Sequence, residues 1–424
     1  MKALFFYQHF WPDSPPYANM LRTISSHFAQ KGHKISVLTA QPSYKVADRS
    51  TRSPAYERLD DVGVRRLALL PGSGSISLLR ALSKASWPLR ACCYLVGQAL
   101  LGRRQEVIVA ATIPPVANGL FGLIAARLTR AKFVYHLQDI YPEIGAAGGL
   151  WSDKSLKHRL LRWFDTLVCK KADCCIVLSE DMANTLKARG VDDTTISVIN
   201  NFMLASFSEE DVEAKSLNDS IVDSEADVRV VFAGNLGRFQ GLELMLQAFM
   251  DVTQDNKVQM ELHFIGEGAA EDLLKTAAQG SPNVFFHGHY PFEEACRLMA
   301  TFDAGIVSIQ PDIYRYAYPS KTLTYLGLGL PLLALVEPES ALAVSIAKDK
   351  LGVAASNTNR QSLMDGFAGM AEYLNSDAND QQRIKALANG SLSCAAVMSQ
   401  WNSMFEELVV RPSEVVGKAD SNDS

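Results

Sequence analysis

Short apolar runs rich in β-branched residues alternate with longer amphipathic stretches along the first half of the chain. The runs are typical of strands buried on both sides, and the stretches between them have the apolar spacing of helices. Parallel strands connected by helices form a sheet that is covered on both faces. The pattern therefore predicts a doubly wound α/β domain. Its expected strands are 4–7, 35–38, 107–110, 133–135 and 174–178.

The same alternation resumes after residue 228 and predicts a second domain of the same class. Its expected strands are 228–232, 262–265, 284–286, 305–309 and 332–336. Between the two halves, residues 208–227 hold eight acidic residues against Lys215 alone and have no periodic apolar face, which is typical of an exposed linker. We therefore expect an N-terminal domain at 1–207 and a C-terminal domain at 228–394.

Composition narrows the class of protein. The 424 residues are 48% hydrophobic and 21% charged, and a formal charge of −5 argues against a nucleic-acid partner, which needs a basic surface. The seven cysteines show neither a metal-binding spacing nor a disulfide framework, so we expect a reducing cytosol and no bound metal. The first apolar run is too short for a signal peptide, and no run approaches the roughly 18 to 20 apolar residues that span a bilayer. The polar tail at 412–424 is expected to be disordered.

Two Gly-rich segments, 231–243 and 318–331, carry the main chemical signal. Each is typical of a buried strand that ends in a Gly-rich loop and then starts a helix, which presents bare backbone N–H groups and the positive end of a helix. Two such loops in one domain predict a bound diphosphate. Lys321 is the strongest candidate ligand, because it follows Pro319 and Ser320 at a helix start, where Ser320 can cap the helix.

Residues 76–104 contain five Lys or Arg and no acid, interleaved with large apolar residues that include Trp87 and Leu95. A basic amphipathic stretch of this kind favours contact with an anionic membrane surface. The alternative is a solvated helix that covers the sheet and is broken at Pro88. A second basic stretch, 154–171, either extends the same membrane face or is simply solvated.

The order of motifs resembles the retaining glycosyltransferases of family 4, which have the GT-B fold. The motifs are Phe10-Trp11-Pro12, Gly-His-Lys-Ile-Ser-Val-Leu-Thr at 32–39, Gln-Asp-Ile-Tyr-Pro-Glu at 138–143, the Gly-rich segment from 231, and Pro319-Ser320-Lys321 with Tyr325, Gly329 and Pro331. The resemblance covers about residues 1 to 340. It implies two Rossmann-like domains that face a central cleft, with a closing helix at about 395–411 packed on the first domain.

The resemblance also implies which residues hold the donor, a UDP- or GDP-sugar. The expected donor-binding residues are Gly234, Asn235, Gly237, Arg238, Gln240, Gly266, Arg315, Ser320 and Lys321. Many members of the family have Arg and Lys where this chain has Asn235 and Gln240, and a pair of Glu where it has Tyr316 and Thr324. Neutralisation of the diphosphate is therefore expected to depend on Lys321, Arg238 and backbone dipoles, without a metal or a further cofactor.

His136, Asp139 and Glu143 follow the predicted strand 133–135, at the carboxyl end where open α/β sheets bind their ligands. We assign Asp139 and Glu143 to the acceptor or to the developing positive charge on the sugar, and His136 to a sugar hydroxyl or a phosphate oxygen. Alternatively, Asp139 caps a turn and Glu143 is a surface residue. In the family, the departing phosphate is thought to help to deprotonate the acceptor hydroxyl.

Together these features predict a retaining glycosyltransferase at the cytoplasmic face of the inner membrane. It would transfer a sugar to a polyprenyl-diphosphate-linked saccharide during synthesis of a bacterial surface polysaccharide. Two alternatives remain: a sugar-nucleotide epimerase, which has no use for the segment 76–104, and a non-catalytic scaffold that has lost the Glu pair. A nicotinamide dehydrogenase is disfavoured because no G-x-G-x-x-G motif opens a βαβ unit.

Overall fold

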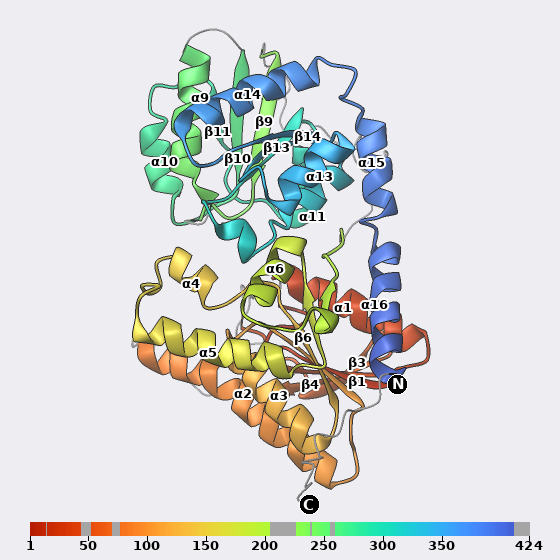
Figure 1. The fold of residues 1–424 in the computed structure, drawn as a ribbon. Helices are drawn as coiled ribbons and strands as arrows, with labels where there is room; N and C mark the ends of the chain where they lie inside the picture. Colours follow the sequence, from red (N-terminus) through yellow and green to blue (C-terminus); the bar gives the residue numbers. More distant parts are fainter. Residues whose placement is uncertain are drawn as a thin grey trace, which may run out of the picture.

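The computed structural model describes residues 1–13, 15–43, 52–69, 77–203, 226–237, 240–254 and 259–410. The chain forms two α/β lobes stacked one above the other, each built on a parallel sheet (Figure 1). We call residues 1–203 together with the last helix the N-terminal lobe, and residues 226–390 the C-terminal lobe. Most of the expected linker at 208–227 and the expected tail at 412–424 lie outside the described residues.

The first sheet has the order β3-β4-β2-β1-β5-β6-β7-β8, and only β3 is antiparallel to its neighbour. Its strands are β1 (Lys2–Phe6), β2 (Lys34–Ala40), β3 (Tyr56–Leu59), β4 (Val62–Leu67), β5 (Val107–Ala111), β6 (Lys132–His136), β7 (Cys174–Val177) and β8 (Ile196–Val198). Its helices are α1 (Pro16–Gln30), α2 (Ser77–Leu100), α3 (Ala117–Thr129), α4 (Glu143–Ala147), α5 (Leu156–Lys171), α6 (Glu180–Ala188) and the short η1 (Asp193–Thr195).

The second sheet is parallel throughout and has the order β11-β10-β9-β12-β13-β14. Its strands are β9 (Val228–Ala233), β10 (Met260–Ile265), β11 (Val284–Phe286), β12 (Ala304–Ser308), β13 (Leu332–Leu335) and β14 (Gly352–Ala355). Its helices are α9 (Leu242–Gln254), α10 (Glu271–Ala277), α11 (Phe292–Met299), η3 (Ile313–Arg315), α12 (Lys321–Gly327), α13 (Ala341–Asp349), α14 (Arg360–Leu374) and α15 (Gln381–Gly390); α16 (Cys394–Val410) follows. Every predicted strand is present, and the expected fold class is confirmed.

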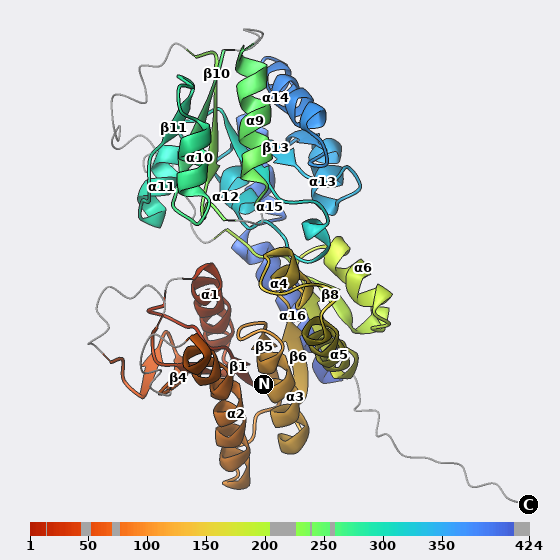
Figure 2. The same ribbon diagram turned by 90° about the vertical axis from the view of Figure 1, so that its left-hand side faces the viewer.

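Both sheets are covered on both faces. In the N-terminal lobe, α2, α3, α5 and α6 pack on one face, while α1 and α16 pack on the other. In the C-terminal lobe, α9, α10 and α14 cover one face, and α11, α12, α13 and α15 cover the other. Figure 2 shows the same two-lobed arrangement from the side.

Helix α2 is continuous through Pro88, so the break at this residue, which was part of the alternative interpretation of the segment, is wrong. The proline removes one backbone hydrogen bond. Trp87 and Leu95 are nevertheless buried against the sheet, and their packing holds the helix on both sides of the proline. These two side chains are part of a segment that the sequence predicts to contact a membrane. In the structure they belong to the core.

The last helix, α16, returns from the C-terminal lobe and completes the core of the first (Figure 1). Trp401 is buried, and its ring lies 6.4 Å from that of Phe5 on β1 and 5.1 Å from that of His136 on β6. Six apolar side chains of α16 recur at helical spacing and pack on this sheet: Val397, Met398, Trp401, Met404, Phe405 and Leu408.

Replacing Trp401 with alanine should therefore destabilise the N-terminal lobe by about 3–5 kcal/mol, because a large buried ring is lost from a packed interface. Urea unfolding followed by the fluorescence of the remaining tryptophans measures the change. Val409→Ala on the same helix is the matched control, since Val409 is 59% exposed. Equal stability of the two variants would contradict this packing.

Candidate functional site

Lys321 is half-buried at the first position of α12, but its ammonium nitrogen is buried and has no hydrogen-bond partner among the described residues. The Nζ atom lies 3.3 Å from the centre of the Phe232 ring, at the carboxyl end of β9. A Cβ atom on Gly234 would lie 3.8 Å from it. Burial lowers the pKa of Lys321 to about 7. The charged form of such a group is costly, and an anion bound beside it would stabilise that form.

Tyr325 positions α12 against the sheet. Its hydroxyl accepts a hydrogen bond from the Ala233 amide at 2.7 Å and donates one to the Val231 carbonyl at 3.2 Å. A Cβ atom on Gly305 would overlap the Tyr325 ring, so this approach requires glycine on β12. The tyrosine of the motif therefore has a structural role: it holds the helix that carries Lys321 at the ends of β9 and β12.

The first Gly-rich loop does not present bare amides as expected. The Gly234 amide donates to the Ile265 carbonyl at 2.8 Å, and the Leu236 amide donates to the Glu267 carbonyl at 3.0 Å. The Gly237 amide donates to the side-chain oxygen of Gln240 at 2.8 Å. These three donors are thus satisfied within the protein, two of them by β10 and the loop that follows it, a tertiary arrangement that the sequence does not reveal.

The structure does not bring the other predicted donor-binding residues together around Lys321. Asn235 is exposed, and Arg238 lies outside the described residues. A Cβ atom on Gly266 would overlap the Gly234 carbonyl, so Gly266 lets two loops pack against each other. Ser320 makes no capping hydrogen bond with its side chain, because its backbone already has helical angles.

Arg315 is exposed in η3, where its Nε lies 3.2 Å from an Asp312 carboxylate oxygen. Its carbonyl accepts a hydrogen bond at 2.8 Å from the Thr185 hydroxyl on α6 of the other lobe. Arg315 therefore lies at the junction of the lobes.

His136 is buried and does not face an open site. Its Nδ1 lies 2.8 Å from the Tyr17 hydroxyl, and its Nε2 lies 2.9 Å from the amide nitrogen of Gln138. Because that amide can only donate, Nε2 accepts and Nδ1 carries the proton. Burial lowers the pKa of His136 to about 3, so the ring is neutral. Both ring nitrogens are thus already hydrogen-bonded, and contact of His136 with a sugar hydroxyl or a phosphate oxygen stays a prediction that requires one of these bonds to be replaced.

Asp139 lies at the contact between the two lobes. Its backbone forms an antiparallel bridge with Ala317, and the next amide, of Ile140, donates to the Tyr316 carbonyl at 2.7 Å. Burial raises the pKa of the Asp139 carboxyl to about 6. Asp139 is thus the one predicted catalytic residue that combines a perturbed pKa with a place at the interlobe contact, as acid–base groups commonly do.

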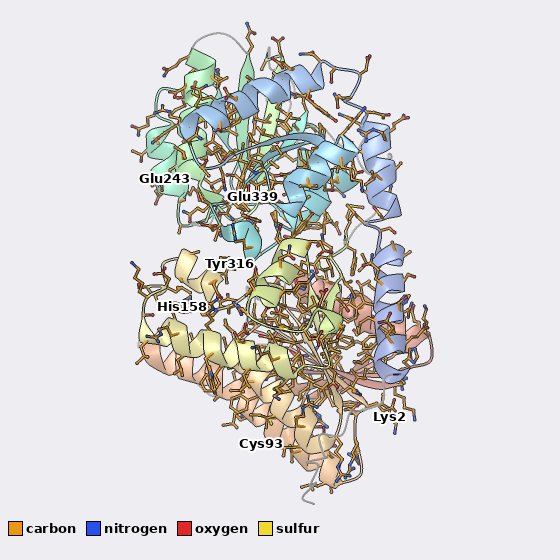
Figure 3. The ribbon with its side chains drawn as sticks, in the orientation of Figure 1. Lys2, Cys93, His158, Glu243, Tyr316 and Glu339 are labelled. Carbon is orange, nitrogen blue, oxygen red and sulfur yellow. The ribbon has the colours of Figure 1, made fainter. Side chains whose placement is uncertain are left out.

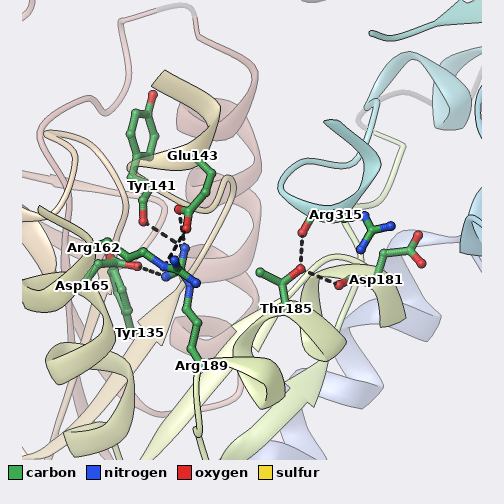
Figure 4. Close-up of polar contacts among 9 residues, drawn as sticks. All are labelled: Tyr135, Tyr141, Glu143, Arg162, Asp165, Asp181, Thr185, Arg189 and Arg315. Atoms are coloured by element: carbon green, nitrogen blue, oxygen red, sulfur yellow. Dashed lines mark hydrogen bonds and ion pairs between the residues drawn. The ribbon is translucent and has the colours of Figure 1, made fainter. Parts of the chain in front are cut away.

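Glu143 forms ion pairs with Arg189 and, at 3.2 Å, with Arg162 (Figure 4). Arg189 also donates to Asp165 at 2.8 Å, and Asp165 accepts a hydrogen bond from Tyr135 at 3.1 Å. Burial raises the pKa of Asp165 to about 6, and the Arg189 guanidinium opposes that rise. The network fixes α4, and with it the loop that carries Asp139, to α5 and α6. Glu143 is therefore neither a free catalytic carboxylate nor a simple surface residue here.

Two contacts between the lobes were missed by sequence reasoning. The Asp181 carboxylate at the start of α6 accepts a hydrogen bond at 2.8 Å from the Ala341 amide at the start of α13. Thr185, one turn further along α6, bonds the Arg315 carbonyl. Figure 3 shows Tyr316 at this junction and Glu339 in the lobe above it. No local sequence signal marks these residues, because their partners lie in the other lobe.

No group of three or more His, Cys, Asp or Glu side chains that could hold a metal ion occurs within the part of the chain that the structure describes. The described helices include none that is long and apolar enough to cross a bilayer.

Comparisons with known proteins agree with this architecture. Residues 17–201 match the family described as a glycosyl transferase 4-like domain. The chain is 26% identical over 254 residues to the probable glycosyltransferase WbjE of Pseudomonas aeruginosa, an alignment that spans 59% of this chain and 62% of that relative. It is 22% identical over 340 residues to WcaI of Escherichia coli K12, a protein whose name describes it as a colanic acid biosynthesis glycosyl transferase. This alignment spans 78% of the chain and 82% of WcaI.

Among solved structures, HepE of Anabaena in complex with UDP superposes with a TM-score of 0.69 and 16% sequence identity. The superposition covers 96% of this chain and 100% of HepE, and it shows a shared fold. Residues 17–201 thus resemble the glycosyl transferase 4-like domain, and the chain shares the two-lobed fold of HepE. The expected resemblance to family-4 glycosyltransferases is confirmed.

Replacing Lys321 with methionine should stabilise the ligand-free protein at neutral pH by about 3 kcal/mol, because it removes a buried unpaired charge. The folded-state pKa of Lys321 is lowered to about 7, below the unfolded value near 10.4, so wild-type stability should rise as the pH rises from 7 to 10. The variant should lack this rise. Amide exchange in β9 and β12 across the pH series measures the effect. Lys348→Met on the exposed surface is the control, and equal stabilities of wild type and Lys321→Met at pH 7 would contradict the assignment.

Proposed function

We propose that the protein is a glycosyltransferase that transfers a sugar from a UDP- or GDP-sugar to a polyprenyl-diphosphate-linked saccharide. The observation that supports this most directly is the buried ammonium of Lys321 at the carboxyl end of β9, which has no hydrogen-bond partner among the described residues. A nucleotide diphosphate carries about two negative charges, and its departure is favoured by preorganised cations in a site shielded from water. Binding of the diphosphate would restore the charge of Lys321, whose pKa burial lowers.

We further propose that transfer retains the configuration of the anomeric carbon, as the resemblance to family 4 implies. The bond between the sugar and the diphosphate breaks, and its electron pair stays with the diphosphate. The acceptor oxygen bonds the same carbon, and its proton passes to the departing diphosphate. Asp139 enters this scheme as a carboxylate that stabilises positive charge on the sugar, since it lies at the contact between the lobes.

A lipid-linked acceptor requires the enzyme to work at a membrane, and the helical layer of the N-terminal lobe has the chemistry for that contact. Helices α2, α3 and α5 lie side by side on one face of the sheet (Figure 1). Their sequences contain a single acidic residue, Asp165, which is buried. Exposed basic residues on this layer and its ends include Arg103, Arg104, Arg127, Arg130, Lys157, Arg159, Lys170 and Lys171.

Exposed apolar side chains lie among these cations. On α5, Leu156, Leu160 and Trp163 recur at helical spacing and are 78%, 53% and 59% exposed, on the side opposite its buried residues. Leu100 and Leu128 extend the apolar surface on α2 and α3. Aromatic and aliphatic side chains surrounded by cationic ones are the combination that binds an anionic lipid surface. We therefore propose a peripheral location at the cytoplasmic face of the inner membrane, with α5 as the main contact.

Replacing Lys321 with alanine should reduce kcat/KM for transfer by about 10²- to 10³-fold, because the departing diphosphate loses its buried cation. Incorporation of radiolabelled sugar into lipid-extractable product, with membrane fractions and a panel of UDP- and GDP-sugars, measures this. Lys348→Ala is the control and should retain activity. NMR of the anomeric proton reports the configuration of the product. No transfer by wild type with any donor would count against the function, and isomerised donor in solution would favour an epimerase instead.

Replacing both Leu160 and Trp163 with glutamate should weaken binding to anionic phospholipid vesicles at least about tenfold, because buried apolar area is lost and charge repulsion is added. Co-sedimentation with phosphatidylglycerol vesicles measures this, and wild-type binding should fall at high salt. Val344→Glu is the control, since Val344 is 54% exposed on α13 of the other lobe. Equal vesicle binding by wild type and the double variant would refute the proposed membrane face.

A further inference from the structure

A groove runs along β8, the strand at one edge of the first sheet. Two adjoining cavities, of about 200 and about 500 Å³, form this groove, and Ser197, Met404 and Glu407 line both of them. The strand borders one side and α16 the other, and Figure 2 shows the two elements next to each other. No residue that we assign to the donor or to the membrane face lines the groove, so the proposed function leaves it without a role.

The outer side of β8 has backbone groups that no strand pairs with. The amide of Ile199, the residue after the strand, donates to the Val177 carbonyl of β7 at 2.9 Å. Successive residues of a strand direct their backbone groups to opposite sides, so Val198 directs its amide and carbonyl away from β7. In the sheet formed by the described residues, β8 is the last strand on that side. Such an edge is a template for the addition of one more strand.

The side of the groove that α16 forms is polar and leaves room for a chain. Its lining residues recur every three or four positions and form one stripe along the helix: Ala396, Ser399, Gln400, Ser403, Met404 and Glu407. The exposed side chains of Ser399, Gln400 and Ser403 make no hydrogen bond to any described residue. Over this stripe the helix rises about 17 Å, which is the length of about five residues of extended chain. An extended chain in the groove would therefore meet hydrogen-bonding groups along most of its length.

The groove is acidic at the end where β8 begins. Asp173, Asp193 and Glu407 line this end, and neither cavity has a Lys or Arg in its lining. Carboxylate oxygens of Asp173 and Asp193 lie 3.3 and 2.8 Å from the ammonium nitrogens of Lys132 and Lys187, which lie outside the lining. A cationic side chain that enters the groove would meet carboxylates alone, whereas an anionic one would be repelled.

We propose that this groove binds an extended, basic segment of a partner protein, which adds a strand to β8. The main chain of the segment bonds the outer amide and carbonyl of Val198, as in other cases of strand addition. Its side chains pack on Val198, which is 37% exposed, and bond to the polar stripe of α16. A Lys or Arg of the segment pairs with the carboxylates at the start of β8. The proposal does not depend on which sugar is transferred or on whether transfer occurs.

Selection from a phage-displayed library of random short peptides, with the full chain as the target, tests the proposal. The selected peptides should be rich in Val, Ile and Thr, with a Lys or Arg near one end. Fluorescently labelled synthetic copies should bind the wild type in a polarisation assay, and their affinity should fall at high salt. In the complex the Val198 amide should exchange with solvent at least about tenfold more slowly, because strand addition engages this amide in a hydrogen bond.

Two variants on α16 place the peptide in the groove. Ser403→Trp fills the groove from an exposed position and should weaken peptide binding at least about tenfold. Val409→Trp is its control, since Val409 is 59% exposed on the same helix and lines neither cavity. Glu407→Lys should weaken binding at least about tenfold, whereas Glu406→Lys, at the neighbouring exposed residue outside the lining, should not. All four variants should keep the circular dichroism and the thermal unfolding of the wild type.

The docking site is refuted if no peptide is selected, or if the selected peptides bind wild type and Ser403→Trp equally. Unchanged exchange of the Val198 amide in the complex would refute strand addition. Two other occupants give distinct results, and either result would replace the partner segment. A dimer, seen by light scattering, that Ser403→Trp dissociates would assign the groove to a second copy of the chain. Removal of residues 411–424 that raises peptide affinity at least about tenfold would assign it to the chain's own tail.

Discussion

The C-terminal lobe is built around a positive charge that it does not neutralise. The Lys321 ammonium is buried against the face of the Phe232 ring, without a hydrogen bond from any described residue. Such a group lowers the stability of the folded protein unless an anion binds beside it. Tyr325 and Gly305 hold α12 in the one position that puts the ammonium there. The stability of the folded protein is thus lowered at the place where we propose that the diphosphate binds.

The loop after β6 connects this site to the other lobe. Asp139 pairs with Ala317, just before the segment that begins α12, while Glu143 is tied through Arg189 to the buried Asp165. An ion network of this kind is costly to break, because removing one member leaves an unpaired buried charge. The position of Asp139 therefore depends on charged residues of α4 and α5 and on Arg189 at the end of α6.

The sequence predicts the central strands well, because strands buried on both faces appear as continuous apolar runs. It misses β3, β4, β8 and β14, which are short or alternate between buried and half-exposed positions. Lys321 is predicted because a helix start and a Gly-rich loop are local signals. The hydrogen bond from the Gly237 amide to Gln240 and the ion pair of Arg189 with Asp165 are not predicted, because both depend on side chains brought together only by the fold.

The return of α16 to the first lobe has a consequence for how the chain matures. The face of the first sheet that Trp401 and its neighbours cover stays open until the final helix has been made. Synthesis from the ribosome delivers β1 and α1 long before α16, which completes the cover of this face. The nascent lobe therefore has one face only partly covered, by α1, while the whole second lobe is translated. A chaperone that shields this waiting surface would act on an unfinished chain for longer than one in which each lobe closes on itself.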